Sequence, residues 1–306
     1  MLVELGLFVG GLALLVLGAD QTVRSAGELA LYYGISTFFV GVTVISVGTS
    51  IPEMTTSIYA ALYGAGDLVV GNIVGSETAQ ITLAIGIVAL IAPIEAERRN
   101  VAIYGGAMTL SMIIMLLTLE DGLLIRSEGF LMMLAYVFFI HDLYSNEGGE
   151  EITEEVIEER APPAKTLPRI FAGLLMVVVG GHLMVTNGIE LGATLGVPTY
   201  LLGVLTGLGT TLPEIAVAGI AAKEGDAGIS VGSLLGSNIT DPVFSLGIGA
   251  LFADVTVNNV AALRLSGAYM LGVSLVVLAL FYWRRGLSRP AGVFCLLLYF
   301  PSFVLL

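Results

Sequence analysis

Long stretches of apolar residues follow one another along almost the whole chain and are separated by short polar connections. A helix needs about 20 predominantly apolar residues to cross the hydrocarbon core of a bilayer. The pattern therefore predicts an all-α membrane protein with ten transmembrane helices. The expected spans are 2–31, 36–63, 68–94, 101–118, 122–143, 167–191, 197–222, 228–251, 261–282 and 288–306.

The composition fits a chain that lies almost entirely in a lipid bilayer. Of the 306 residues, 56% are hydrophobic and only 12% are charged, and the mean hydropathy is +0.95. A soluble globular chain carries about twice that charged fraction. The single cysteine, Cys295, excludes a disulfide framework. The start, MLVELGLFVGG, has neither a basic region nor a cleavage site, so we do not expect a removable signal peptide.

The longest polar connection is an acidic segment, which we place at 144–166. Seven glutamates between positions 147 and 159 account for much of the net charge of −13. A run of like charges is usually a solvated loop. The chain shows no basic patch of the kind that binds nucleic acid, so a nucleic-acid partner is not expected.

The basic residues of the connections predict how the chain lies in the cell membrane. Arg and Lys accumulate in cytoplasmic loops. With the N-terminus outside, ten of the 12 basic residues fall on the cytoplasmic side, and only Arg126 and Arg264 fall outside. Ten spans then place both termini outside and the acidic segment in the cytoplasm.

The chain contains an internal repeat. Residues 48–86 align without a gap onto 209–247 at an offset of 161, and 12 of the 39 aligned positions are identical. We expect a first five-helix repeat at 1–143, the acidic cytoplasmic loop at 144–166 and a second five-helix repeat at 167–306. Because five is an odd number, the two repeats must be inverted relative to each other, which is the plan of many secondary transporters.

Each repeat carries the same polar motif in the middle of its second span. GTSIPE occupies 48–53 and GTTLPE occupies 209–214. Gly and Pro interrupt a helix, so backbone carbonyls there need other partners. A bare carboxylate costs several kcal/mol in hydrocarbon. A bound cation would satisfy the carbonyls together with Glu53 and Glu214. A protonated, hydrogen-bonded Glu would explain one copy, but it explains two matched copies less well.

The third span of each repeat adds further oxygen ligands. GNIVGSETAQ occupies 71–80 and GSLLGSNITD occupies 232–241. In both segments a serine is followed one turn later by an amide or an acid on the same face, and these residues are Ser76, Gln80, Ser237 and Asp241. Oxygen ligands suit hard cations such as Ca²⁺, which takes roughly six to eight of them. The same carboxylates cannot neutralise Ca²⁺ and several Na⁺ ions together, and this mutual exclusion is a physical basis for exchange.

The two pairs of motifs resemble the two α-repeats of the calcium/cation antiporter superfamily, and within it the archaeal sodium/calcium exchangers. The resemblance implies an antiporter that exchanges Ca²⁺ for Na⁺ by alternating access. It also implies long, tilted first and sixth helices that slide across the core. We expect a transporter rather than an enzyme, with no cofactor besides the transported ions, and a bundle that requires no oligomer.

The resemblance also implies the ion ligands. A calcium site would use Glu53, Glu214 and the carbonyls of Thr49 and Thr210. An outer sodium site would use the Gly207 carbonyl, Thr210, Thr211, Ser237 and Glu53. An inner sodium site would use the Ser46 carbonyl, Thr49, Ser50, Ser76 and Glu214. Gln80 and Asp241 would occupy the middle position.

One departure from the family pattern leaves the coupling ion open. The first repeat reads GSETAQ, so Glu77 adds a carboxylate where the second repeat has Asn238. Proton/calcium exchangers of the same superfamily also have acids in this region. An exchanger of Ca²⁺, or of another divalent cation, for H⁺ is therefore an alternative. A more distant alternative is an intramembrane hydrolase with two catalytic acids, although such enzymes use Asp in other motifs.

Overall fold

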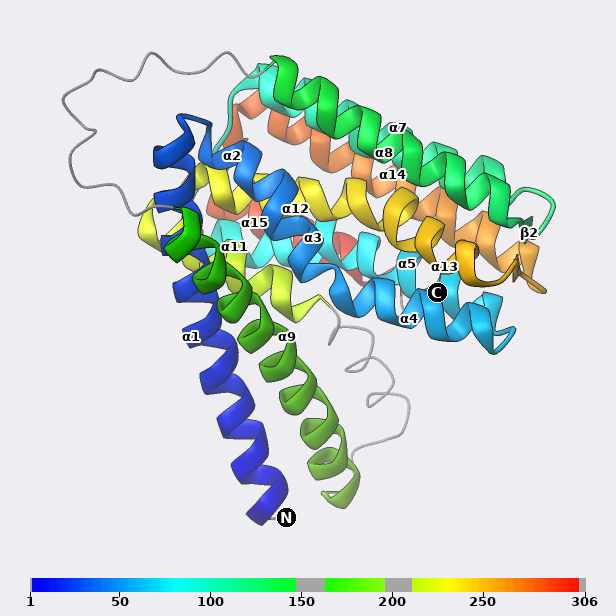
Figure 1. The fold of residues 1–306 in the computed structure, drawn as a ribbon, viewed down its shortest axis with the longest axis horizontal. Helices are drawn as coiled ribbons and strands as arrows, with labels where there is room; N and C mark the ends of the chain where they lie inside the picture. The colour runs from blue at the N-terminus through cyan, green and yellow to red at the C-terminus, as the bar shows by residue number, and fades with distance from the viewer. Residues whose placement is uncertain (1, 147–162, 196–210, 303–306) are drawn as a thin grey trace.

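The protein is described by a computed structural model that covers residues 2–146, 163–195 and 211–302, and most of these residues are helical (Figure 1). The chain begins with one long helix, α1 (Leu2–Tyr33). The next stretch is built from short pieces, which are α2 (Thr37–Val40), the π-helical segment η1 (Gly41–Ile45), α3 (Ser46–Thr49) and α4 (Ile51–Leu62). The first half continues with α5 (Gly66–Ala79), the π-helical segment η2 (Gln80–Ala84), α6 (Ile85–Ile91), α7 (Arg98–Thr118) and α8 (Arg126–Asn146).

The second half has the same order of elements in the part that the structure describes. It consists of α9 (Pro163–Thr194), α11 (Leu212–Glu224), α12 (Ala227–Thr240), the π-helical segment η4 (Asp241–Ser245), α13 (Leu246–Phe252), α14 (Val260–Arg284) and α15 (Arg289–Tyr299). From α5 to α6 and from α12 to α13, every boundary recurs at the offset of 161 found in the sequence. The glycines that turn the chain before α5 and α12, Gly64 and Gly225, both have positive φ angles, of 67° and 85°.

The expectation of an all-helical chain needs one small correction, because the structure contains four two-residue strands. β1 (Ile94–Glu95) pairs antiparallel with β4 (Gly286–Leu287), and β2 (Leu123–Leu124) pairs antiparallel with β3 (Val255–Thr256). Each pair joins a connection of the first half to a connection of the second half. The strands are too short for an alternating pattern to reveal them in the sequence.

The helices α1 and α9 pack along each other and cross the other helices at a steep angle (Figure 1). Glycine allows this close approach. A Cβ atom at Gly18 would lie 2.6 Å from the carbonyl oxygen of Gly173, and one at Gly180 would lie 2.5 Å from the backbone nitrogen of Leu15. Both helices pack against α11, and α1 also packs against α2, while α9 also packs against α3. This arrangement agrees with the expectation of two long helices that lie across a core.

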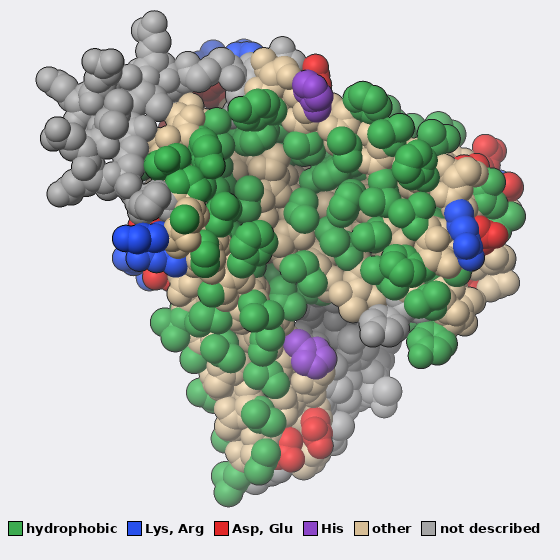
Figure 2. Space-filling view, viewed as in Figure 1, with side chains coloured by type: hydrophobic (Ala, Val, Ile, Leu, Met, Phe, Trp, Pro, Cys, Tyr) green, Lys and Arg blue, Asp and Glu red, His purple; other side chains and the backbone are tan. Residues whose placement is uncertain are grey.

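The helices α12 and α5 carry the third-span motifs and lie inside the bundle, and α12 is the more deeply buried of the two. Every residue of α12 from Ile229 to Thr240 is buried. Around them, α7 packs on α12 and α14, α8 packs on α13, and α15 packs on α6. Hydrophobic side chains cover much of the face shown in Figure 2. Across the described residues, many large hydrophobic side chains are exposed, and Leu117, Phe138 and Trp283 are 65%, 64% and 72% exposed. Because so large an apolar surface is unfavourable in water, it fits contact with lipid.

Length and composition identify five described helices that can cross a membrane, or six if the bent pair Thr37–Thr49 and Ile51–Leu62 is one span. The five are Leu2–Tyr33, Gly66–Ile91, Arg98–Thr118, Pro163–Gly192 and Val260–Arg284. The expected span at 197–222 begins outside the described residues. Most of the expected acidic loop at 144–166 also lies outside them. The count of ten spans therefore stays a prediction.

Candidate functional site

The predicted break in the second span lies at Ser50, between α3 and α4. Ser50 has φ −76° and ψ 4°, and the helix changes direction by 43° around it. Pro52 has no N–H, so it cannot donate the helical hydrogen bond to the carbonyl of Gly48, four residues earlier. Glu53 consequently lies in the first turn of a new helix, where the helix dipole favours a negative charge. Its side chain is completely buried.

The second half repeats this arrangement as far as the structure describes it. The helix α11 begins after Thr211, which is its N-cap residue, and Pro213 and Glu214 lie in its first turn. The side chains of Thr211 and Glu214 are both completely buried. The predicted ligands Gly207 and Thr210 lie outside the described residues.

The third span of each half changes from an α-helix to a π-helix at the predicted middle position. The π-helical segment η2 begins at Gln80, and η4 begins at Asp241. Ser76 and Ser237, one turn earlier, are buried as well. Short π-helical segments inside α-helices occur frequently at functional sites, and here they coincide with the polar residues that the sequence singles out.

Hydrogen bonds join the site residues of the two halves directly. The hydroxyl oxygens of Thr49 and Ser237 are 3.4 Å apart. The Gln80 side-chain amide donates to Oδ2 of Asp241 at 3.2 Å. The Asn238 amide donates to Oε1 of Gln80 at 2.8 Å. The two sets of predicted residues therefore form one buried site.

Hydroxyl groups of the first half also lie beside acids of the second half. The hydroxyl of Thr49 lies near the carboxylate of Glu214, and the hydroxyl of Ser50 lies near the carboxylate of Asp241. The carbonyl of Ser46 already accepts hydrogen bonds from the backbone N–H of Ser50 at 3.0 Å and from the Thr49 hydroxyl at 3.3 Å. A sodium ion at this carbonyl would replace the Thr49 hydrogen bond, so the role of the Ser46 carbonyl stays a prediction.

Four carboxylates share this buried centre. Glu77 lies within electrostatic range of Asp241, Glu53 and Glu214, and all four side chains are completely buried. No Lys or Arg side chain of the described residues is buried. Buried carboxylates are stable only when their charge is balanced, so these four require cations or protons.

The polar side chains of this buried centre offer oxygen atoms, which is the kind of ligand that the sequence predicts. Among the described residues, no three His, Cys, Asp or Glu side chains are positioned around one metal ion. A calcium site with two glutamates and two backbone carbonyls does not need a third acid. The donors that the helix breaks and the serines supply are carbonyl and hydroxyl oxygens, which suit hard cations.

Three polar residues beside the site lie outside the set predicted from the motifs. Asn238 holds Gln80, and Ser245 donates to Oδ1 of Asp241 at 2.9 Å. Both could have been found, because they lie three and four residues from Asp241 and hence on its face of the helix. Tyr136 receives a hydrogen bond from Thr240 at 3.1 Å. It comes from α8, and no local pattern connects it with the motifs.

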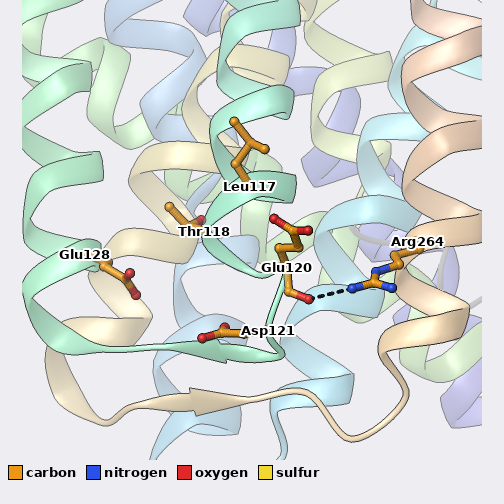
Figure 3. A pocket seen from close by; sticks show the side chains of 6 residues that line it. All are labelled: Leu117, Thr118, Glu120, Asp121, Glu128 and Arg264. Carbon is orange, nitrogen blue, oxygen red and sulfur yellow. Dashed lines mark hydrogen bonds between the residues drawn. The ribbon is translucent and has the colours of Figure 1, made fainter.

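A second cluster of acidic residues, Glu120, Asp121 and Glu128, lies at the molecular surface beside β2 (Figure 3). It belongs to an open pocket of about 410 Å³, which is lined by Leu117, Thr118, Glu120, Asp121, Glu128 and Arg264. Its polar groups hold the surrounding loop in place. Arg264 donates to the carbonyl of Glu120 at 3.1 Å, and Glu128 accepts from the backbone N–H of Ile125 at 3.1 Å. We therefore assign this group a structural role.

Comparison with known proteins covers nearly the whole chain. The family described as "Sodium/calcium exchanger protein" matches residues 3–141 and 166–306. The chain is 34% identical to inner membrane protein YrbG of Escherichia coli, with 97% of this chain and 94% of that protein aligned. It is 29% identical to sodium/calcium exchanger MaX1 of Methanosarcina acetivorans, with 97% and 96% aligned.

A solved structure shows the same fold. The sodium-calcium exchanger NCX_Mj, soaked with 10 mM Na⁺ and zero Ca²⁺, superposes with a TM-score of 0.83. The sequence identity is 28%, and the match covers 99% of this chain and 98% of the other. The similarity therefore extends to the arrangement of the whole helical bundle.

Proposed function

The chain belongs to the sodium/calcium exchanger family, and on that premise we propose that it exchanges Ca²⁺ for Na⁺ across the cell membrane by alternating access to the buried site. The observation that carries the proposal is the charge of this site. Four buried carboxylates from both halves lie together with buried hydroxyls, and no Lys or Arg of the described residues is buried with them. A site of this kind binds cations, and it is a poor fit to an enzyme that acts on a polar substrate.

The ligands are assigned as the motifs imply. Ca²⁺ binds between Glu53 and Glu214, with the carbonyls of Thr49 and Thr210. Na⁺ binds on either side of this position, where hydroxyls flank the acids. The contact between Thr49 and Ser237 and the proximity of Thr49 to Glu214 support this arrangement, because they bring the hydroxyls of both halves to the same acids.

The proposed architecture is ten transmembrane helices in two inverted five-helix repeats, complete as a monomer. Alternating spans place the connections that contain β1 and β4 on one side of the membrane and those that contain β2 and β3 on the other. The two strand pairings join these same connections and thus support the alternation. Arg98 and Arg285 lie beside β1 and β4 and support a cytoplasmic position for that side, with both termini outside.

The proposed function predicts that only an outward Na⁺ gradient drives Ca²⁺ uptake. Purified protein would be reconstituted in vesicles loaded with NaCl, KCl or acidic buffer and diluted into medium that contains radiolabelled Ca²⁺ but lacks the loaded ion. We expect uptake from the NaCl-loaded vesicles alone. After the site has released Ca²⁺ inside the vesicle, Na⁺ must bind its two carboxylates before the site can open to the outside again. An ionophore that dissipates the Na⁺ gradient should abolish this uptake.

The same experiment tests H⁺ as the rival coupling ion, which the additional acid Glu77 leaves open. Uptake from acid-loaded vesicles alone would show that the protein exchanges Ca²⁺ for H⁺, and it would contradict the proposed sodium sites. Absence of uptake under all three conditions would contradict calcium exchange itself. The KCl-loaded vesicles control for leakage and for the membrane potential.

A further inference from the structure

Glu77 is a buried acid to which the proposed exchange cycle assigns no role. It lies in α5, one residue after Ser76, and its side chain is 0% exposed. Neither of its carboxylate oxygens has a hydrogen-bond partner among the described residues. A buried carboxylate without a partner is strongly unfavourable, so Glu77 requires a partner that this part of the chain does not supply.

The internal repeat indicates which residue of the second half is the counterpart for Glu77. At the offset of 161, Glu77 corresponds to Asn238 and Gln80 corresponds to Asp241. Asn238 donates across the site to Gln80 at 2.8 Å. The equivalent pair in the other direction is Glu77 with Asp241, and Asp241 is one of the three carboxylates near Glu77.

The chemistry of the two equivalent pairs differs. Asn238 and Gln80 are amides, so one can donate and the other can accept. Glu77 and Asp241 are carboxylates, which only accept when they are ionised, and their like charges repel each other in a buried environment. Asp241 already accepts hydrogen bonds from Ser245 and Gln80, at 2.9 Å and 3.2 Å, which holds its carboxylate in place. A cation between the two acids would satisfy Glu77 and remove the repulsion.

We propose that Glu77 and Asp241 form an additional cation-binding subsite, and that it takes a monovalent cation, Na⁺ in the proposed exchange. The inference rests on the proposed function and deepens it. Two carboxylates offer too few oxygens for Ca²⁺, which takes roughly six to eight. A second divalent ion would also be repelled by Ca²⁺ at Glu53 and Glu214. The carboxylate of Glu77 therefore lets the site balance one more positive charge than Glu53, Glu214 and Asp241 could balance without it.

The test compares the wild type with Glu77→Gln, which keeps the shape of the side chain and removes its charge. Na⁺-driven Ca²⁺ uptake would be measured in proteoliposomes as a function of Na⁺ concentration and at clamped membrane potentials, which together give the number of Na⁺ ions exchanged per Ca²⁺. We expect this number to fall by one in Glu77→Gln. Glu77→Asp, which keeps the charge, should retain the wild-type number.

Two controls separate the subsite from folding and from surface charge. Exchange of Ca²⁺ for radiolabelled Ca²⁺ in the absence of Na⁺ depends on the calcium site alone, and Glu77→Gln should retain it if the variant is folded. Should Glu77→Gln fail to fold, Glu77→Asn, which places the residue of the second repeat in the first, replaces it. Glu97→Gln removes an exposed carboxylate and should leave the Na⁺ number unchanged.

The outcomes distinguish this inference from the proposed function. A wild-type protein without Na⁺-driven uptake would contradict the function itself. A wild type that exchanges Na⁺ for Ca²⁺, together with a Glu77→Gln variant that has the same Na⁺ number, would overturn the subsite alone. Uptake by the wild type from acid-loaded vesicles that is lost in Glu77→Gln would show that Glu77 carries a proton and would also overturn the subsite.

Discussion

Replacing either Glu53 or Glu214 by Gln should abolish calcium exchange. Both side chains are completely buried in the first turn of a helix. Glutamine keeps the volume of the side chain but removes one negative charge and one strong oxygen ligand from the bound cation. Loss of one partner of a buried charge pair costs about 2–5 kcal/mol, which corresponds to a loss of roughly 30-fold or more in affinity. Radiolabelled Ca²⁺ uptake into Na⁺-loaded proteoliposomes measures the effect.

The control for these substitutions is Glu97→Gln, which makes the same chemical change at an exposed position outside the site. It should exchange at the wild-type rate. Near-normal Ca²⁺ flux in Glu53→Gln or in Glu214→Gln would contradict the assignment of the calcium site, even if the protein proves to be an exchanger.

Replacing Gly236 by Val should separate the two halves of the site. A Cβ atom at Gly236 would lie 2.6 Å from Cα of Val42 and 2.9 Å from Cβ of Ser46, so α12 would have to move away from η1 and α3. This movement would pull Ser237 away from Thr49. Overpacking of this kind lowers the free energy of unfolding by about 1–3 kcal/mol. We expect a lowered unfolding temperature in detergent and a loss of Na⁺-driven Ca²⁺ uptake.

Gly272 provides the matched control, because it lies in α14 and a Cβ atom there would meet no atom within 4 Å. Gly272→Val should leave both the unfolding temperature and the uptake close to those of the wild type. If Gly236→Val behaved in the same way, the close packing of α12 against η1 would not be needed to assemble the site.

Most of the helical architecture could be predicted because its physical cause is local. Apolar runs of the length that a bilayer requires mark the long helices, and α1, α7 and α14 follow the expected spans within four residues at each end. The family resemblance, which rested on four short motifs, is confirmed by a match over residues 3–141 and 166–306. The strands β1 to β4 were missed because pairing of two-residue segments depends on tertiary contacts rather than on local sequence.

Within the site, the sequence predicted the polar side chains and the helix break in the second span, but not the π-helical segments. The motifs predicted buried positions for Glu53, Glu214, Gln80 and Asp241, and the structure buries all four. The sequence did not predict that the helices become π-helical at Gln80 and Asp241, since no residue type is specific to a π-helix. The internal repeat was the decisive signal, because a duplicated polar group in the middle of two spans has no explanation in packing alone.

The central claim is that Ca²⁺ and Na⁺ exclude each other from one site, and calorimetric titration of the purified protein with Ca²⁺ tests it most directly. The titration would be made in a sodium-free buffer and then in buffers of equal ionic strength that contain NaCl or KCl. We predict that Ca²⁺ binds in the sodium-free and KCl buffers and that NaCl displaces it. Equal Ca²⁺ affinity in NaCl and in KCl would contradict the account, because the two ions would then occupy separate sites and one could not drive the other.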